Sequence, residues 1–196
     1  LVKKALMNGK NIITANKALL AVHGNELIKI AEKNDCFISY EAAIAGGIPV
    51  VKAIRENLRY NDISKVYGIL NGTCNYILTK METEGKDFSS VLKEAQKLGF
   101  AELDPSFDIK GIDAAHKITL LSSLAFNVPV SFSSTFIEGI QNIEIDDFKL
   151  VNEFGYKIKL LGIAKKQGRF YEQRVHPCLI RSNSEIAKVD NELNAV

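Results

Sequence analysis

The spacing of apolar residues predicts a chain in which helices and short strands are mixed. The clearest helical pattern starts at Phe88, where apolar side chains recur at positions i, i+3, i+4, i+7 and i+10 before Gly99 ends the helix. Further helices are predicted before Gly9, from Gly24 onward, through 51–58, through 76–85, over 108–127 and over 146–154. In the 76–85 helix, the hydroxyl of Thr73 is expected to cap the first turn.

Extended segments are predicted in two regions of the chain. Short strands are expected at 11–14, where the strand reads as buried, at 36–40 and at 62–70. Later, Tyr156–Leu160 alternates apolar and polar residues, and Gln167 and Gly168 form a turn before Phe170–Val175. This pattern predicts an antiparallel hairpin near the edge of a sheet. The fold class expected is α+β: one mixed, mostly open β-sheet covered on one face by helices.

Composition and net charge limit the classes of partner that the chain is expected to bind. The chain has 196 residues, 46% of them hydrophobic, and a formal net charge of +2. This charge gives no reason to expect nucleic acid or a membrane surface as partner, and no apolar run approaches the roughly 20 residues that cross a bilayer. Cys36, Cys74 and Cys178 are far apart and form neither a zinc spacing nor a disulfide framework. A reducing, cytoplasmic location is therefore expected.

The first residues already read as a helix followed by a strand, which is the second half of a βαβ unit. The chain also begins at Leu1 and stops abruptly after Asn194-Ala195-Val196. These features predict that the sequence is a piece of a longer protein.

The stretch AELDPSFDIKGIDAAHK concentrates acidic residues. Its charged side chains are Glu102, Asp104, Asp108, Lys110, Asp113 and Lys117. If a helix begins at Asp108, then Asp113 and Lys117 lie at i and i+4 on one apolar helix, where a partly desolvated lysine could exchange a proton near neutral pH. The alternative is a solvated helix entrance with an exposed ion pair worth a few tenths of a kcal/mol, roughly.

The longer run AQKLGFAELDPSFDIKGIDAAHK resembles the signature of homoserine dehydrogenases. Three further stretches are similar to the same family: IITANK, YEAAIAGGIPV and GILNGTCNYIL. All four occur in the family's order. The resemblance implies reduction of aspartate 4-semialdehyde to L-homoserine by NAD(P)H, on the pathway to threonine, methionine and isoleucine.

The resemblance also implies roles for individual residues. Lys117 would be the general acid and Asp113 would orient it. Glu102 would accept the substrate ammonium group, with Asp108 and Thr73 as further substrate contacts. Carbonyl reduction does need a proton donor at the oxygen, and an amino-acid substrate needs a carboxylate for its ammonium group.

On the same basis, Lys17 would lie between the nicotinamide and the substrate, and Thr14 would lie near the cofactor. The Rossmann spacing GxGxxG is absent from this sequence. NAD or NADP would therefore be bound mainly by a domain outside this chain, and the chain alone is expected to be inactive. Residues 1–16 are expected to be a remnant of the dinucleotide-binding domain with its hinge, and residues 17–196 the substrate-binding, catalytic and dimerisation domain.

The AAIAGGIPV loop allows two interpretations. Its glycines and proline are typical of an ordinary turn before a helix. The resemblance instead implies a sodium-like cation bound at Glu41, Ile44, Gly46 and Ile48, mainly through main-chain carbonyls.

Three histidines and one cysteine are expected to have no catalytic role. His116 is expected at the surface or behind the reacting groups, His23 in a turn, His176 as structural, and Cys74 as a buried, inert thiol. The partners expected are a small amino-acid substrate and a second copy of the chain. A non-catalytic dimerisation or binding module of the same fold remains the alternative function.

Overall fold

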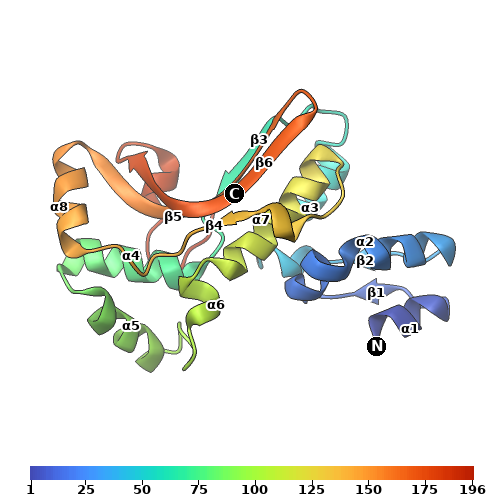
Figure 1. Ribbon diagram of the computed structural model, residues 1–196, viewed down its shortest axis with the longest axis horizontal. Helices are drawn as coiled ribbons and strands as arrows, with labels where there is room; N and C mark the ends of the chain where they lie inside the picture. The colour runs from blue at the N-terminus through green and yellow to red at the C-terminus, as the bar shows by residue number, and fades with distance from the viewer. The chain divides into compact units, whose positions relative to one another are not determined.

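The computed structural model describes residues 1–196 (Figure 1). The chain forms two compact units, which are described separately. The first contains Leu1–Val66, His116–Thr135 and Ala164–Gln173, and the second contains Tyr67–Ala115, Phe136–Ile163 and Arg174–Val196. Every helix is too short or too polar to cross a membrane.

The first unit begins with a small parallel pair of strands between helices. Its first elements are α1 (Val2–Met7), β1 (Ile12–Ile13), α2 (Lys17–Lys33) and β2 (Ile38–Ser39). Ile12 pairs with Ile38 in parallel. The expectation of a buried strand here was wrong, because Ile13 is 85% exposed. This two-stranded sheet is also separate from the main sheet, so the fold is not built on one sheet alone.

Helix α2 starts earlier than its apolar pattern predicts. The Asn16 side chain accepts a hydrogen bond from the Leu19 amide at 2.9 Å, which caps the helix so that Lys17 is its first residue. Gly24 therefore lies inside the helix rather than at its start, and His23 is helical rather than in a turn. The capping asparagine was the signal that the sequence prediction overlooked.

The first unit continues through a short 3-10 turn and a helix of mixed type. These elements are η1 (Glu41–Ala43), α3 (Val50–Lys52), the π-helical segment η2 (Ala53–Asn57) and, later, η3 (Phe132–Ser134). The helix predicted through Val51 and Ile54 is confirmed, and it ends at Asn57, one residue before Leu58.

The remaining elements build the main sheet and the helices around it. In chain order they are β3 (Lys65–Gly68), α4 (Gly72–Glu84), α5 (Phe88–Lys97), α6 (Ser106–Ile109), α7 (Ile112–Phe126), β4 (Phe136–Ile137), α8 (Ile145–Glu153), β5 (Tyr156–Gln167), β6 (Phe170–Arg181) and η4 (Glu185–Lys188). The strand order is β3-β5-β6-β4, with Phe136 beside Arg174 in a parallel pairing of β4 with β6. The predicted hairpin and the α+β fold with a mixed sheet are confirmed. The hairpin strands are central in the strand order, so their predicted position near the edge was wrong.

The single helix expected over 108–127 is two helices. Gly111 has a φ of 80°, a left-handed conformation that favours glycine, and it separates α6 from α7. The segment after β4 packs against this break between the helices. The Ile140 amide donates to the Ile109 carbonyl at 2.9 Å. A Cβ added at Gly139 would lie only 2.1 Å from the same carbonyl oxygen. Glycine at 139 therefore permits the close approach.

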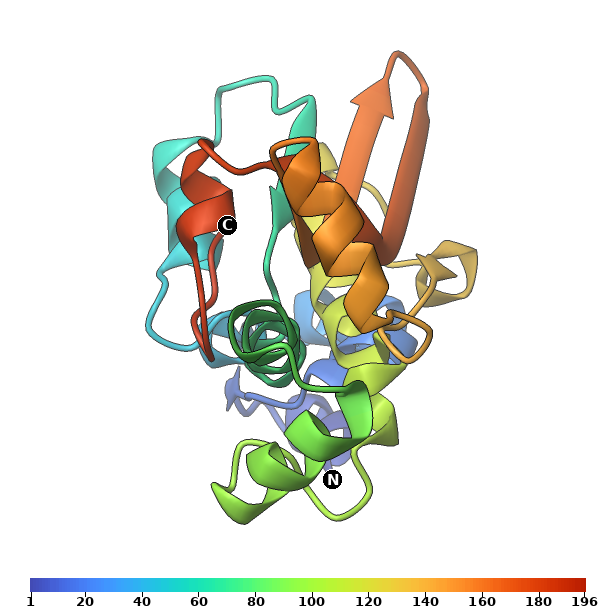
Figure 2. The ribbon, with the colours of Figure 1, turned by 90° about the vertical axis from the view of Figure 1, so that its left-hand side faces the viewer.

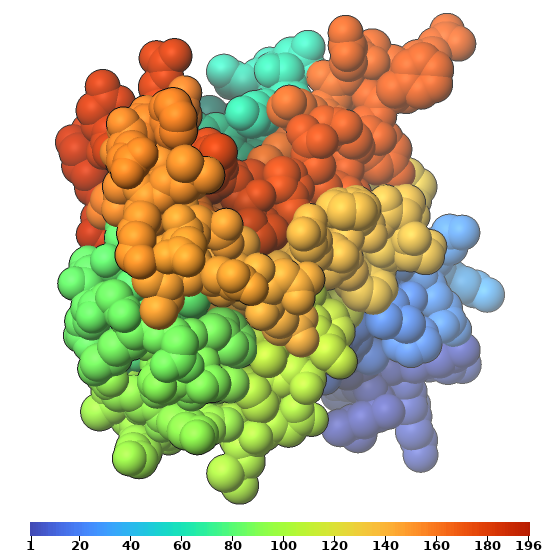
Figure 3. Space-filling view, turned by 60° about the vertical axis from the view of Figure 1, so that its left-hand side comes forward, coloured from blue at the N-terminus to red at the C-terminus, as the bar shows by residue number.

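Helix α4 is the centre of the second unit. Its residues Cys74 to Thr79 are all buried, and it contacts α5, α6 and α8. Figure 3 shows α8, in orange, lying on the green surface that contains α4 and α5. Figure 2 shows the red C-terminal segment running beside α4. The position of the α4 N-terminus is thus fixed from several directions.

Candidate functional site

Two carboxylates of the acidic stretch are held by one asparagine. Asn71, at the start of α4, donates from Nδ2 to Asp108 Oδ1 at 2.8 Å and to Asp113 Oδ2 at 3.0 Å. Asn71 and Asp113 are only 5% and 4% exposed, and Asp108 is half-buried. The structure therefore joins Asp108 and Asp113, two of the residues predicted for the site, through a buried amide.

The remaining polar atom of Asn71 is also used. Its Oδ1 accepts the Cys74 amide at 2.8 Å, which makes Asn71 the N-cap of α4. An amide group has two N–H donors, so it can satisfy two carboxylates while its oxygen caps the helix. Buried polar groups are stable only when they are hydrogen-bonded. The positions of the Asp108 and Asp113 carboxylates therefore depend on the position of the start of α4.

Thr73 has a different role from the predicted cap. Its hydroxyl donates to the Phe100 carbonyl at 2.7 Å, and the cap lies two residues earlier, at Asn71. The Phe100 ring packs against Tyr76 with 4.9 Å between centroids. Together these contacts fasten the segment that leads into Glu102 to the first turns of α4.

Glu102 lies on the loop after α5, and its side chain is exposed. The loop backbone is held by Gln96, whose Nε2 donates to the carbonyls of Glu102 at 3.0 Å and Leu103 at 3.3 Å. Asp104 accepts the Ser106 amide at 3.1 Å, as expected for a turn residue before Pro105. Hydrogen bonds from Ser106 lower the pKa of the Asp104 carboxyl. The backbone contacts leave the Glu102 carboxylate facing solvent.

Lys117 follows Asp113 by one turn of the continuous helix α7, so both residues lie on one helix face. Lys117 is half-buried. His116 was expected either at the surface or behind the reacting groups. The surface position was wrong, because His116 is 5% exposed and its ring packs on Phe132 with 4.4 Å between centroids. Cys74 is fully buried, as predicted, with Sγ 3.2 Å from the Asp108 carbonyl.

In the first unit, the residues predicted near the cofactor form a capped turn. The Asn16 amide donates to the Thr14 hydroxyl at 3.0 Å, and the Asn16 side chain caps α2. Lys17 is the first residue of that helix and is half-buried. Thr14 and Lys17 are thereby fixed on either side of one asparagine, at the end of β1.

The predicted cation loop is organised by Glu41. Its carboxylate accepts the backbone amides of Val51 at 2.8 Å and Lys52 at 2.9 Å, at the start of α3. The carbonyl oxygens of Ile44 and Gly46 accept no hydrogen bond within the chain. No group of three or more histidine, cysteine or acidic side chains could hold a metal ion. Main-chain oxygens are therefore the groups that this loop offers to a cation.

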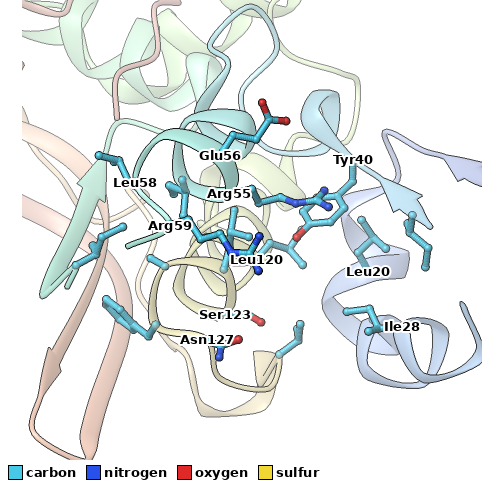
Figure 4. Close-up of a pocket in the computed structure, with 18 of the residues that line it drawn as sticks. Leu20, Ile28, Tyr40, Arg55, Glu56, Leu58, Arg59, Leu120, Ser123 and Asn127 are labelled. Carbon is cyan, nitrogen blue, oxygen red and sulfur yellow. The ribbon is translucent and has the colours of Figure 1, made fainter. Parts of the chain in front are cut away.

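The first unit also contains a pocket of about 990 Å³ (Figure 4). Arg55 and Arg59 project into it, and in Figure 4 the Arg55 guanidinium lies beside the Tyr40 ring. Burial raises the pKa of the Tyr40 hydroxyl, and the Arg55 charge opposes this rise. None of the site residues predicted from the sequence lines this pocket. It is therefore distinct from the acidic cluster.

Sequence comparison identifies relatives of the whole chain. A family model described as homoserine dehydrogenase matches residues 49–196, and one described as the homoserine dehydrogenase NAD-binding domain matches residues 1–41. The homoserine dehydrogenase of Neisseria gonorrhoeae is 53% identical over 100% of this chain and 45% of its own length. That of Pseudomonas aeruginosa is 51% identical with the same coverage.

Solved structures give the same result. The crystal structure of a homoserine dehydrogenase from Thiobacillus denitrificans matches with a TM-score of 0.97 and 50% identity, over 98% of this chain and 45% of that one. A hyperthermophilic archaeal homoserine dehydrogenase in complex with NADPH matches with a TM-score of 0.84 and 29% identity, over 98% of this chain and 55% of that one. The chain spans about 45% of the length of the curated relatives. It belongs to the homoserine dehydrogenase family of oxidoreductases.

Proposed function

We propose that this chain supplies the substrate-binding and catalytic part of an enzyme that interconverts L-aspartate 4-semialdehyde and L-homoserine, for the synthesis of threonine, methionine and isoleucine. The observation that carries the proposal is the buried Asn71 amide, which holds Asp108 and Asp113 at the start of the helix that contains Lys117. A chain that served only assembly would have no use for two carboxylates tied together in this way.

Lys117 is the proposed proton donor. When bound, the nicotinamide supplies a hydride to the aldehyde carbon, which leaves negative charge on the carbonyl oxygen. The Lys117 ammonium gives its proton to that oxygen, and the neutral amine accepts the hydroxyl proton in the reverse direction. Asp113, one helical turn earlier, orients the ammonium.

Glu102 is the proposed anchor for the substrate ammonium group. Its exposed carboxylate is an acceptor, and Gln96 holds the backbone beneath it. Asp108 and Thr73 are proposed as further substrate contacts. The Thr73 hydroxyl donates to Phe100, so its oxygen still has lone pairs to accept a hydrogen bond.

In this proposal, two separate parts of the full-length protein bind the nicotinamide cofactor. Thr14 and Lys17, at the capped turn, contact the nicotinamide end of NAD or NADP. The rest of the cofactor is bound mainly outside residues 17–196, since the sequence contains no GxGxxG loop. Residues 1–16 then belong to the dinucleotide-binding domain and its hinge, and the later residues to the substrate domain.

A sodium-like cation is proposed at the loop after Glu41. The ligands are the carbonyls of Ile44, Gly46 and Ile48, with Glu41 beside them. The carbonyls of Ile44 and Gly46 are unused within the chain, and hard cations prefer oxygen ligands. Such an ion would hold the loop that precedes α3 and stabilise its fold.

An assay of the full-length protein tests the proposed function. L-homoserine should drive reduction of NAD⁺ or NADP⁺, followed by the absorbance of the reduced nicotinamide. The 196-residue chain alone should show no turnover and no micromolar affinity for NADH or NADPH in calorimetric titration. A full-length protein that reduces neither cofactor with L-homoserine would contradict the proposal.

A further inference from the structure

The second unit buries a lysine that the proposed chemistry does not use. Lys159, on β5, is 1% exposed. Its Nζ donates to Val189 O at 2.7 Å, Asp190 Oδ1 at 2.8 Å and Asn75 Oδ1 at 3.1 Å. An ammonium group has three donors, so all three are satisfied. A buried charge is tolerated only when it is paired and hydrogen-bonded, and burial itself lowers the pKa of Lys159.

The acceptors of Lys159 connect two segments that are far apart in the sequence. Asn75 belongs to the first turns of α4, whereas Val189 and Asp190 belong to the C-terminal segment. Asn75 extends the connection, since its Nδ2 donates to Val189 O at 3.0 Å and to Leu193 O at 3.1 Å. Lys159 and Asn75 together therefore fasten the C-terminal segment to α4.

The same segment continues over the strand-to-helix turn before α4. The Ala195 amide donates to Ile69 O at 3.1 Å. A Cβ added at Gly68 would lie 2.2 Å from Ala195 O, and one added at Gly72 would lie 2.6 Å from Glu192 O. The turn that presents Asn71 is thus covered by backbone that only glycine can accept so closely.

Asn75 and Asn71 lie one helical turn apart at the start of α4. Asn71 points its amide to Asp108 and Asp113, and Asn75 points its polar atoms to Lys159 and the C-terminal segment. A displacement of the α4 start would therefore move the acids of the proposed site. Lys159 itself contacts neither acid, so it can act on them only through α4.

We propose that Lys159 is a positioning residue, which locks the C-terminal segment onto the start of α4 and thereby fixes Asn71, Asp108 and Asp113 for catalysis. This inference rests on the proposed function. A purely structural role would be served equally well by an apolar side chain, because replacing a buried ion pair with apolar groups is often neutral for stability.

The principal test uses the full-length enzyme with Lys159→Met and Asp190→Asn combined, which removes the ammonium without leaving an unpaired carboxylate. The variant should lose at least tenfold in kcat with a smaller change in KM. Hydrogen exchange at the Cys74 amide, which Asn71 caps, and at Ala195 should accelerate at least tenfold.

Lys157→Met is the matched control. Lys157 lies on the same strand and is 3.6 Å from Asp190, but its contact with α4 is a 3.8 Å salt bridge to Glu82, near the C-terminal end of that helix rather than at its start. This variant should keep wild-type turnover and wild-type exchange at Cys74. Asn75→Ala provides a second route if the double variant does not fold, because Lys159 keeps Asp190 and Val189 as partners; it should accelerate the same amides and lower kcat.

The outcomes separate this inference from the proposed function. Absence of turnover in the wild-type full-length protein would overturn the proposed function, and the exchange rates would still report whether Lys159 holds the α4 start. Unchanged exchange at Cys74 in both variants would overturn the inference. Accelerated exchange with wild-type kcat would overturn it as well, because the lock would then be structural only.

Discussion

The side-chain nitrogen of Asn71 lies 3.0 Å from Oδ2 of Asp113, and both side chains are buried. The same nitrogen donates to Asp108. One neutral amide thus donates to two carboxylates, and these hydrogen bonds offset the repulsion between them. The start of α4 and the acids of α6 and α7 consequently form one hydrogen-bonded group.

Replacing this amide with an acid should destabilise the protein. Asn71→Asp keeps the size and the helix cap but places a third carboxylate against Asp108 and Asp113. Asn71→Ser, which also caps helices, is the control. We expect Asn71→Asp to be less stable than Asn71→Ser by about 1–3 kcal/mol at neutral pH, measured by urea denaturation. The difference should shrink on acidification, because a protonated carboxyl can donate; a constant difference would contradict the arrangement.

Glu102→Gln should weaken substrate capture. The change keeps the shape of the side chain and removes the charge that pairs with the substrate ammonium, and hydrogen bonds to charged groups contribute about 1.5–3 kcal/mol. KM for L-homoserine in the full-length enzyme should rise about tenfold or more, with a smaller fall in kcat. Glu185→Gln, a change at an exposed carboxylate paired with Lys188, should leave both parameters unchanged. A normal KM for Glu102→Gln would remove Glu102 from the substrate site.

Asp190 should make stability sensitive to acid. Partial burial opposes its ionisation, but the hydrogen bond and charge of Lys159 outweigh this effect and lower its pKa. A carboxyl with a lowered folded-state pKa stabilises the fold above its unfolded pKa, about 3.9, and this contribution is lost as pH falls through the folded pKa. Unfolding free energy should therefore fall less between about pH 5 and about pH 2 in Asp190→Asn than in the wild type.

The exposed pair of Asp146 with Lys149 provides the comparison for Asp190. The Lys149 hydrogen bond lowers the pKa of Asp146 too, but both side chains are largely exposed, so solvent screens their interaction. Asp146→Asn should leave the acid dependence close to that of the wild type. If the unfolding free energy of Asp190→Asn depended on pH in the same way as that of the wild type and of Asp146→Asn, Lys159 would not hold Asp190 in solution.

Apolar side chains on the main sheet predict association of two copies. Tyr67 on β3, Phe136 on β4 and Leu179 on β6 are 41%, 59% and 61% exposed. β3 and β4 are the two edge strands, and β6 lies beside β4. Large exposed apolar side chains on a sheet are typical of protein interfaces. Sedimentation at micromolar concentration should give the mass of a homodimer, and Leu179→Lys should shift it toward one chain. Leu150→Lys, at an exposed position on α8, is the control, and a wild-type monomer would contradict the prediction.

The sequence predicts elements well where local periodicity decides them. The amphipathic helix at Phe88, the hairpin around Gly168 and the helix ending at Gly85 are all present. These segments follow from side-chain spacing and from glycines that stop helices. Of the acidic residues singled out in the sequence, Asp108 and Asp113 are joined through the side chain of Asn71.

The remaining differences arise from contacts that spacing does not encode. The break at Gly111 lies against residues 138–140, which are distant in the sequence but in contact in the fold. Asn71 was not singled out, although an asparagine before a predicted helix is a favoured cap and was the available signal. Its two bonds to acids more than 35 residues away become visible only in three dimensions.

The most direct test of the central claim is the turnover of Lys117→Ala in the full-length enzyme. General acid catalysis contributes about 10² to 10⁴-fold, so kcat should fall by that order, with a smaller change in KM and an unchanged melting temperature. Asp104→Asn, at the turn before Pro105, should affect stability rather than rate. Near-normal turnover of Lys117→Ala would show that the acidic stretch is a solvated helix entrance and that the chemistry lies elsewhere.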